Sequence, residues 1–294
     1  MVFFIQMVLS GLAVGSIYAL VAFGFCLVYK STKVVNFALG DLLTLGAFLL
    51  WTLSVQLHLP FWLSILIGIG LASLLGVIIE RLALRPMVGR SLLPTVMVTI
   101  GLSSFIGGVT NMFYAGPTQV YPDWLPNISL ELGEIMISSD ILTSFIIAIA
   151  TFIFFTLFFR YTKLGLDMRA VAEDQQIAQA VGAKVSFVFS MTWVLAAVLS
   201  MIGGLVLGTI QGINQSLLLM GMKVFPVVLL GGLESFLGAI IGGLIIGVAE
   251  TLSIGYINEF VGGGFEEIIS YVIMIIILIF KPYGLFGLER IERI

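Results

Sequence analysis

A series of long apolar runs constrains the fold of this chain more than any other feature. The first run, from Val2 to Val28, contains no charged residue. An apolar helix needs about 20 residues to cross the roughly 30 Å of hydrocarbon in a bilayer. The run also exceeds the apolar core of a signal peptide and has no basic segment before it. It therefore predicts a membrane-spanning helix.

Composition supports an integral membrane protein. The chain is 60% hydrophobic and 10% charged, with a mean hydropathy of +1.19, whereas soluble domains carry about 25% charged residues. Its 33 glycines suit close helix packing in lipid. The net charge of -3 argues against a nucleic-acid partner. With one cysteine, Cys26, and one histidine, His58, we expect neither a disulfide framework nor a metal site.

We predict an all-α, polytopic membrane bundle with about eight membrane elements. The expected spans lie near 2–29, 34–56, 60–80, 92–115, 141–159, 187–211 and 267–280, together with a glycine-broken element near 223–252. The whole chain, 1–294, is expected to form a single transmembrane domain.

Lysine and arginine concentrate in the cytoplasmic loops of membrane proteins. Here they mark four loops, with the residues Lys30, Lys33, Arg81, Arg85, Arg90, Arg160, Lys163, Arg169, Lys184, Lys281, Arg290 and Arg293. The loops at 116–140 and 253–266 contain neither residue type. This pattern predicts that loop 160–186 is cytoplasmic and that loop 116–140 is extracytoplasmic, with the N-terminus also outside.

Counting the crossings requires the element at 223–252 to begin and end on the outside. Its first part spans only half a membrane and breaks at Gly231-Gly232. We predict a re-entrant or strongly broken element, which is tolerated where protein or water covers the freed backbone groups. A single tilted helix is the alternative.

Eight polar residues are candidates for a substrate pathway: Asn36, Asp41, Thr99, Ser103, Gln211, Asn214, Gln215 and Glu234. Asp41 is the most costly, because a carboxylate at the bilayer centre costs about 2.5–3.5 kcal/mol on insertion scales. We expect it to pair with Asn36 inside the bundle or, alternatively, with nearby lysines at the cytoplasmic interface.

The other candidates also have two interpretations. Thr99 and Ser103 either line a path or bond neighbouring helices. Glu234 either contacts a ligand at the glycine break or caps the helix that follows. The group at 211–215 forms an external vestibule or is simply solvated. The small-residue pairs Gly11/Gly15, Gly204/Gly208 and Gly243/Gly247 predict close helix approach.

Enzymatic functions fail because the necessary residues are missing. No second intramembrane aspartate accompanies Asp41, and the single histidine precedes Pro60 in a predicted turn. No glycine-rich loop followed by Lys-Ser or Lys-Thr occurs, so the chain does not bind ATP in the P-loop manner. We predict no catalytic residues and no cofactor here, so energy for transport comes from another chain or from an ion gradient.

The stretch Arg160–Ser186 is the longest polar run. We predict a helix from Leu166 to Val181, with Gly182 as its stop. A narrow apolar stripe on this helix contains Ala170, Ile177, Ala178 and Val181. Such a helix either inserts into a groove on a soluble partner or is a plain amphipathic connector.

Three blocks of the sequence resemble the LivH-type permease of branched-chain amino acid ABC importers. They are GLAVGSIYALVAFGFCLVYKSTKVVNFALGDLLTLGAF (Gly11–Phe48), RAVAEDQQIAQAVG (Arg169–Gly182) and VVLLGGLESFLGAIIGGLIIGVAE (Val227–Glu250), and the terminal KPYGLFG (Lys281–Gly287) also fits. The chain departs from the family at Leu39, where relatives have a polar residue, and this departure puts one ligand contact in question.

The resemblance implies a membrane subunit in a bacterial cytoplasmic (inner) membrane that moves branched-chain or other apolar amino acids. Its implied partners are a second, LivM-type permease, two cytoplasmic ATPases that bind ATP and Mg, and an external substrate-binding protein. The implied coupling segment carries Arg169, Glu173, Asp174, Ala178 and Gly182. The alternative is a stand-alone secondary carrier that uses Asp41 and Glu234 to couple transport to an ion gradient.

Overall fold

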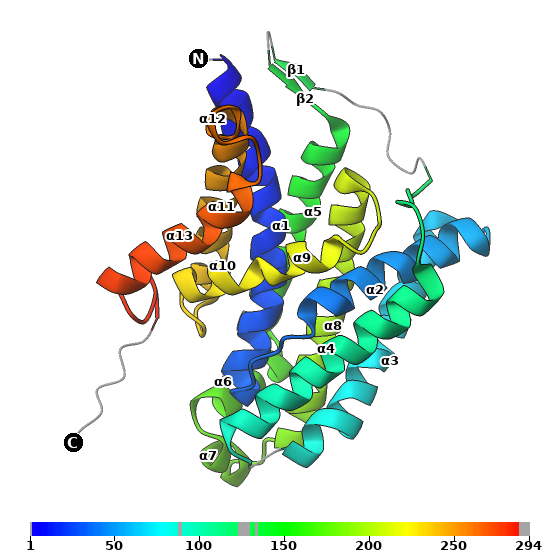
Figure 1. Ribbon diagram of the computed structural model, residues 1–294. Helices are drawn as coiled ribbons and strands as arrows, with labels where there is room; N and C mark the ends of the chain where they lie inside the picture. Colours follow the sequence, from blue (N-terminus) through cyan, green and yellow to red (C-terminus); the bar gives the residue numbers. More distant parts are fainter. Residues whose placement is uncertain (1, 88–89, 123–129, 133–134, 288–294) are drawn as a thin grey trace. The chain divides into compact units, whose positions relative to one another are not determined.

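The computed structural model describes residues 2–87, 90–122, 130–132 and 135–287 (Figure 1). These residues form two compact units, one from the described parts of 1–26, 125–149 and 223–294, and the other from 27–124 and 150–222. Arg290 and Arg293 lie outside the described residues, as do 123–129 and 133–134 of the predicted extracytoplasmic loop 116–140.

The described residues are mostly helical, which confirms the predicted fold class. The first half of the chain contains α1 (Val2–Thr32), α2 (Leu39–Trp51), a π-helical turn η1 (Thr52–Gln56), α3 (Phe61–Ile79), a π-helical turn η2 (Glu80–Leu84), a 3-10 turn η3 (Arg85–Met87) and α4 (Leu92–Tyr114). A short antiparallel hairpin, β1 (Leu130–Leu132) and β2 (Ile135–Ile137), precedes α5 (Ser139–Tyr161).

The second half contains α6 (Lys163–Glu173), α7 (Gln175–Ala180), α8 (Val185–Gln211), α9 (Leu217–Met222), α10 (Val224–Gly231), α11 (Phe236–Tyr256), α12 (Asn258–Val261) and α13 (Phe265–Phe280). Seven of the described helical segments are long and apolar enough to cross a membrane, and α13 has 16 residues at the predicted span 267–280. The short helix α9 was not predicted, because no separate apolar period marks it.

Helix α8 is the centre of the second unit, where it packs against α2 and α3. Close approach depends on glycine. A Cβ at Gly204 would lie 3.1 Å from the backbone nitrogen of Ala47 in α2, and one at Gly76 in α3 would lie 2.7 Å from the carbonyl oxygen of Trp193 in α8. The predicted packing role of Gly204 is therefore confirmed.

In the first unit, α1 and α11 meet through glycines. A Cβ at Gly15 would lie 2.6 Å from the carbonyl oxygen of Gly243, and one at Gly11 would lie 3.0 Å from that of Gly247. Backbones this close exclude any side chain at the crossing, which is the usual geometry of small-residue motifs in membranes. The prediction for Gly11/Gly15 and Gly243/Gly247 is confirmed.

The element predicted at 223–252 is broken where expected. Helix α10 ends at Gly231, Gly232 has a φ of +105° that favours glycine, and α11 begins at Phe236. The two helices pack antiparallel: Gly231 lies against Gly238, and a Cβ at Gly242 would lie 2.6 Å from the carbonyl oxygen of Val227. A single tilted helix is therefore excluded.

The C-terminal segment covers the backbone groups that this break frees. The amides of Leu285 and Phe286 donate to the carbonyl oxygens of Leu230 and Gly231, at 2.8 and 3.0 Å. Gly284, with a φ of +80°, permits the turn that brings them there. The KPYGLFG segment thus satisfies carbonyls that have no partner within α10, as the predicted break of a membrane element requires.

Candidate functional site

Asp41 is buried in the second unit, with 3% of its surface exposed. The hydroxyl of Ser103, on α4, donates to its carboxylate oxygen Oδ2. One turn further along α4, a Cβ at Gly107 would lie 2.6 Å from Oδ1, so the glycine leaves room for the carboxylate. The expected pairing with Asn36 is wrong, because the side-chain oxygen of Asn36 accepts from the amide of Ala38 instead, at 3.0 Å.

The polar stripe on α4 also holds the linker between α1 and α2 (33–38). The hydroxyl of Thr99 is 2.9 Å from the carbonyl oxygen of Val35 and 2.9 Å from that of Val96. Thr99 and Ser103 therefore bond neighbouring segments. Asn36, in the same linker, is fully buried, and its amide nitrogen has no hydrogen-bond partner among the described residues. A substrate role for these residues stays a prediction.

The turn after α8 is tied to the loop that follows α4. Ile213 and Gln119 exchange backbone hydrogen bonds of 2.7 and 2.8 Å, and Asn214 Nδ2 donates to Thr118 Oγ1 at 3.2 Å. Gln211 is exposed. Gln215 is half-buried, and its amide nitrogen has no partner among the described residues. An external vestibule at these residues stays a prediction.

Glu234 lies half-buried in the break between α10 and α11. The residue that caps α11 is Ser235, whose hydroxyl oxygen accepts from the amide of Gly238 at 3.0 Å. The alternative role of Glu234 as the cap is therefore wrong, and its contact with a ligand stays a prediction.

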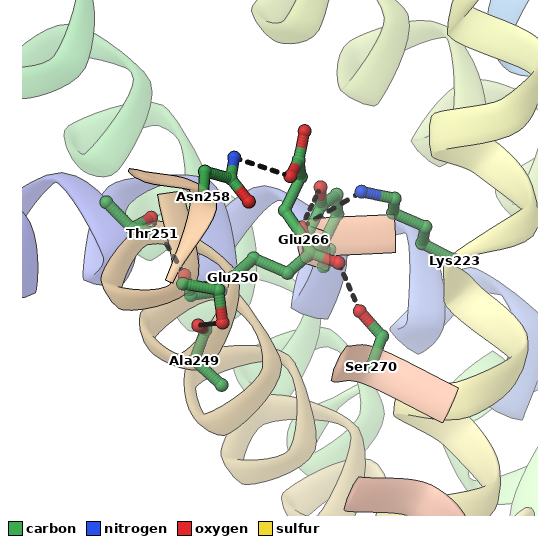
Figure 2. Close-up of polar contacts among 10 residues, drawn as sticks. Lys223, Ala249, Glu250, Thr251, Asn258, Glu266 and Ser270 are labelled. Carbon is green, nitrogen blue, oxygen red and sulfur yellow. Dashed lines mark hydrogen bonds and ion pairs between the residues drawn. The ribbon is translucent and has the colours of Figure 1, made fainter. Parts of the chain in front are cut away.

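Sequence reasoning missed a buried charge cluster in the first unit (Figure 2). Lys223 Nζ lies 3.2 Å from Glu250 Oε2, which also accepts from the hydroxyl of Tyr18 at 2.8 Å. The hydroxyl of Ser270 donates to Glu250 Oε1. All four residues are buried, with exposed fractions of 6% or less.

The cluster joins four elements of that unit: α1 through Tyr18, the start of α10 through Lys223, α11 through Glu250 and α13 through Ser270. A buried ion pair is stable only when further hydrogen bonds satisfy its oxygens, and two hydroxyls do so here. The sequence signal was the isolated cation Lys223 between two apolar helices.

A second buried carboxylate, Glu80, was also missed. It lies in η2 with 2% of its surface exposed, and Arg85 Nε and a terminal nitrogen of Arg85 donate to its two oxygens at 3.0 and 3.2 Å. Ser190, on α8, donates to Oε2 at 2.6 Å. The sequence analysis placed Glu80 at the end of the predicted span 60–80, directly before Arg81, and assigned it no role.

The predicted coupling segment is two helices, so the single helix Leu166–Val181 is wrong. Asp174 has an extended backbone and caps α7, because its Oδ1 accepts from the amides of Gln176 and Ile177 at 2.8 and 2.9 Å. Such a residue favours a helix start over a helix interior. Gly182, with a φ of +97°, follows the end of α7 as predicted.

The exposed side of this helix pair carries most of the predicted coupling residues. Arg169, Glu173, Asp174 and Gly182 are exposed. Ala178 is 2% exposed, so this chain itself covers its methyl group. The apolar side chains of Ile177 and Val181 are 65% and 77% exposed.

The fold and these sites define a multi-pass membrane protein with buried polar clusters and an exposed helix pair between two of its spans. The chain belongs to the family described as "Branched-chain amino acid transport system / permease component", which it matches over residues 7–280. That description makes the family one of transport subunits.

Named relatives agree with this assignment. The chain is 30% identical to the high-affinity branched-chain amino acid transport system permease protein LivH of Escherichia coli, over 99% of this chain and 98% of the relative. BraD of Pseudomonas aeruginosa is also 30% identical with the same coverage, and a probable LivH of Methanocaldococcus jannaschii is 29% identical over 97% and 93%. PsaBC from Streptococcus pneumoniae, solved in complex with Fab, aligns with 93% of this chain and 90% of that chain at a TM-score of 0.49 and 16% identity.

Proposed function

We propose that this chain is the permease subunit of an ATP-driven ABC importer, and that it translocates branched-chain or other apolar amino acids delivered by an external binding protein. The observation that carries the proposal is the near full-length similarity to permease proteins of high-affinity branched-chain amino acid transport. The substrate class is transferred from the names of these relatives.

The proposed complex contains a second, LivM-type permease and two cytoplasmic ATPases, which supply the ATP and Mg sites. The absence of a P-loop from the sequence supports an energy source on another chain. The complex lies in the bacterial cytoplasmic membrane, with the α6–α7 pair on the cytoplasmic side.

In this proposal α6 and α7 receive the motion of the ATPases. Three observations support that role. In the sequence the pair follows α5 and precedes α8, its apolar residues Ile177 and Val181 are exposed, and the cap at Asp174 fixes the turn between the two helices. Exposed apolar side chains on a short polar helix fit insertion into a groove of a soluble partner.

Purification of the tagged full-length chain from its native membrane in mild detergent tests the composition of the complex. We expect P-loop ATPases and a second permease to co-purify in defined ratio. Recovery of the chain without any ATPase, together with uptake by the chain alone under a proton or sodium gradient, would instead show a secondary carrier.

A further inference from the structure

Three irregularities of the backbone meet around one cavity of about 210 Å³ in the second unit. Lys33, which follows α1, has a φ of +57°, a conformation that few residues other than glycine adopt. The π-helical turn η2 ends α3, and Gln175 follows the break between α6 and α7. Strained backbone and π-helical turns often occur at functional sites, and here residues from all three line the same cavity.

The charged side chains that line this cavity are three cations, Lys33, Arg85 and Arg90, and one carboxylate, Glu80. Arg85 makes a two-pronged contact with both oxygens of Glu80, and Ser190 donates to one of them as well. The carboxylate is therefore neutralised within the protein. The lining as a whole carries an excess of positive charge, which favours an anionic occupant.

The hydroxyls of Thr32 and Thr95 in the lining are not available to donate a hydrogen bond to an anion. Thr32 donates to the carbonyl oxygen of Val28 at 2.7 Å, and Thr95 donates to that of Ser91 at 3.2 Å. Both hydroxyl protons are thus used within the protein, so an anion would have to be bound by the cations of the lining. Arginine forks and lysine ammonium groups suit phosphate oxygens in particular.

The rest of the lining is apolar and includes Phe189 and Trp193. Leu82 and Leu93, each two residues from a lining residue in the sequence, are 75% and 66% exposed, as expected for side chains that contact lipid. Basic pockets that lie beside lipid-facing helices on the cytoplasmic side bind anionic headgroups.

We propose that this cavity binds the phosphoryl group of an anionic ligand, supplied by a phospholipid headgroup of the cytoplasmic leaflet. The choice of the cytoplasmic leaflet rests on the topology given in the proposed function, whereas the affinity for a phosphoryl group does not. Because Gln175 begins α7 and Lys33 begins the linker to α2, the bound group contacts both the helix pair and the linker.

Lipid retention by the purified full-length chain tests the proposal. The chain is exchanged into detergent with equal amounts of phosphatidylglycerol and phosphatidylcholine, and the bound lipid is measured by native mass spectrometry. We expect preferential retention of phosphatidylglycerol, reduced about fivefold by Arg90→Gln or Lys33→Gln, since each basic residue near the surface contributes on that scale. Arg81→Gln is the matched control, because Arg81 is an exposed cation of η2 outside the cavity lining.

Inorganic phosphate distinguishes the two sources of the phosphoryl group. The thermal stability of the wild type and of Arg90→Gln is measured with and without millimolar phosphate. If phosphate stabilises only the wild type and no lipid is retained selectively, the phosphoryl site is filled from solution rather than from lipid. Equal lipid retention by Arg90→Gln, Lys33→Gln and Arg81→Gln, with no effect of phosphate, would overturn the proposal. Lys33→Arg keeps the charge and should retain wild-type binding, which separates loss of charge from misfolding.

Discussion

The ammonium of Lys223 lies 3.2 Å from the carboxylate of Glu250, and this buried ion pair ties the start of α10 to α11. The two residues meet because α10 and α11, which the break at Gly231-Gly232 separates, pack antiparallel. Tyr18 and Ser270 complete it by donating to the same carboxylate.

Lys223→Met should destabilise the protein by about 3–5 kcal/mol, because removal of one partner leaves a buried charge uncompensated. Lys281→Met, at an exposed lysine of the same unit, should change stability by less than about 0.5 kcal/mol. Thermal unfolding in detergent measures both. Equal stability of the two variants would show that the ion pair does not hold α10 and α11 together.

Gly243→Ala should separate α1 from α11. The new Cβ would lie 2.6 Å from the backbone nitrogen of Ala19 and 2.7 Å from the carbonyl oxygen of Gly15, neither of which a side-chain rotation can relieve. A loss of about 1–3 kcal/mol is expected for overpacking of this kind. Gly101→Ala is the control, since nothing lies within 4 Å of its Cβ position and alanine favours helix by up to about 1 kcal/mol.

Ser103→Ala should cost about 1–3 kcal/mol, because it removes the hydrogen bond of a buried carboxylate. Asp41→Asn preserves an acceptor for the Ser103 hydroxyl and should keep the protein folded. Ser73→Ala is a control, since this exposed hydroxyl bonds only within its own helix, at Ile69. If the Ser103→Ala chain were as stable as the Ser73→Ala chain, the contact with Asp41 would have no structural weight.

The stability of the first unit should depend on pH through Glu266, in the first turn of α13. A hydrogen bond of 2.8 Å from the amide of Asn258 lowers the pKa of this carboxyl below its ordinary value of 4.5. A lowered pKa in the folded state stabilises the fold above the ordinary pKa, and this contribution is lost as the pH falls through the folded value.

Asn258→Ala should therefore lower the melting temperature at neutral pH and reduce the extra loss on acidification below pH 4.5. Melting curves recorded between neutral pH and acid measure the difference. Identical pH profiles for the two chains would contradict a stabilising role of this hydrogen bond.

Asp174→Ala removes the cap of α7, at a typical cost of about 1 kcal/mol. In the proposed complex, this change should uncouple ATP hydrolysis from uptake without affecting membrane insertion. Asp174→Asn supplies another good cap and should preserve coupling. Normal transport by Asp174→Ala would show that the geometry of this helix pair does not carry the motion of the ATPases.

Apolar length and glycine placement predicted the spans and the break at 223–252, because both act locally along the chain. The partners of buried charges were not predictable in the same way. Asp41 bonds to Ser103 on another helix, and Lys223 reaches Glu250 only after α10 and α11 have packed against each other. The cap at Asp174 was a local signal, yet the surrounding helix-favouring residues concealed it.

Uptake of radiolabelled leucine into proteoliposomes tests the proposed function most directly. The purified complex is compared with this chain alone, each with ATP and the external binding protein or with an imposed ion gradient. We expect accumulation only with the full complex, ATP and binding protein together. Gradient-driven accumulation by the isolated chain, with no response to ATP, would contradict its assignment as the permease of an ATP-driven importer.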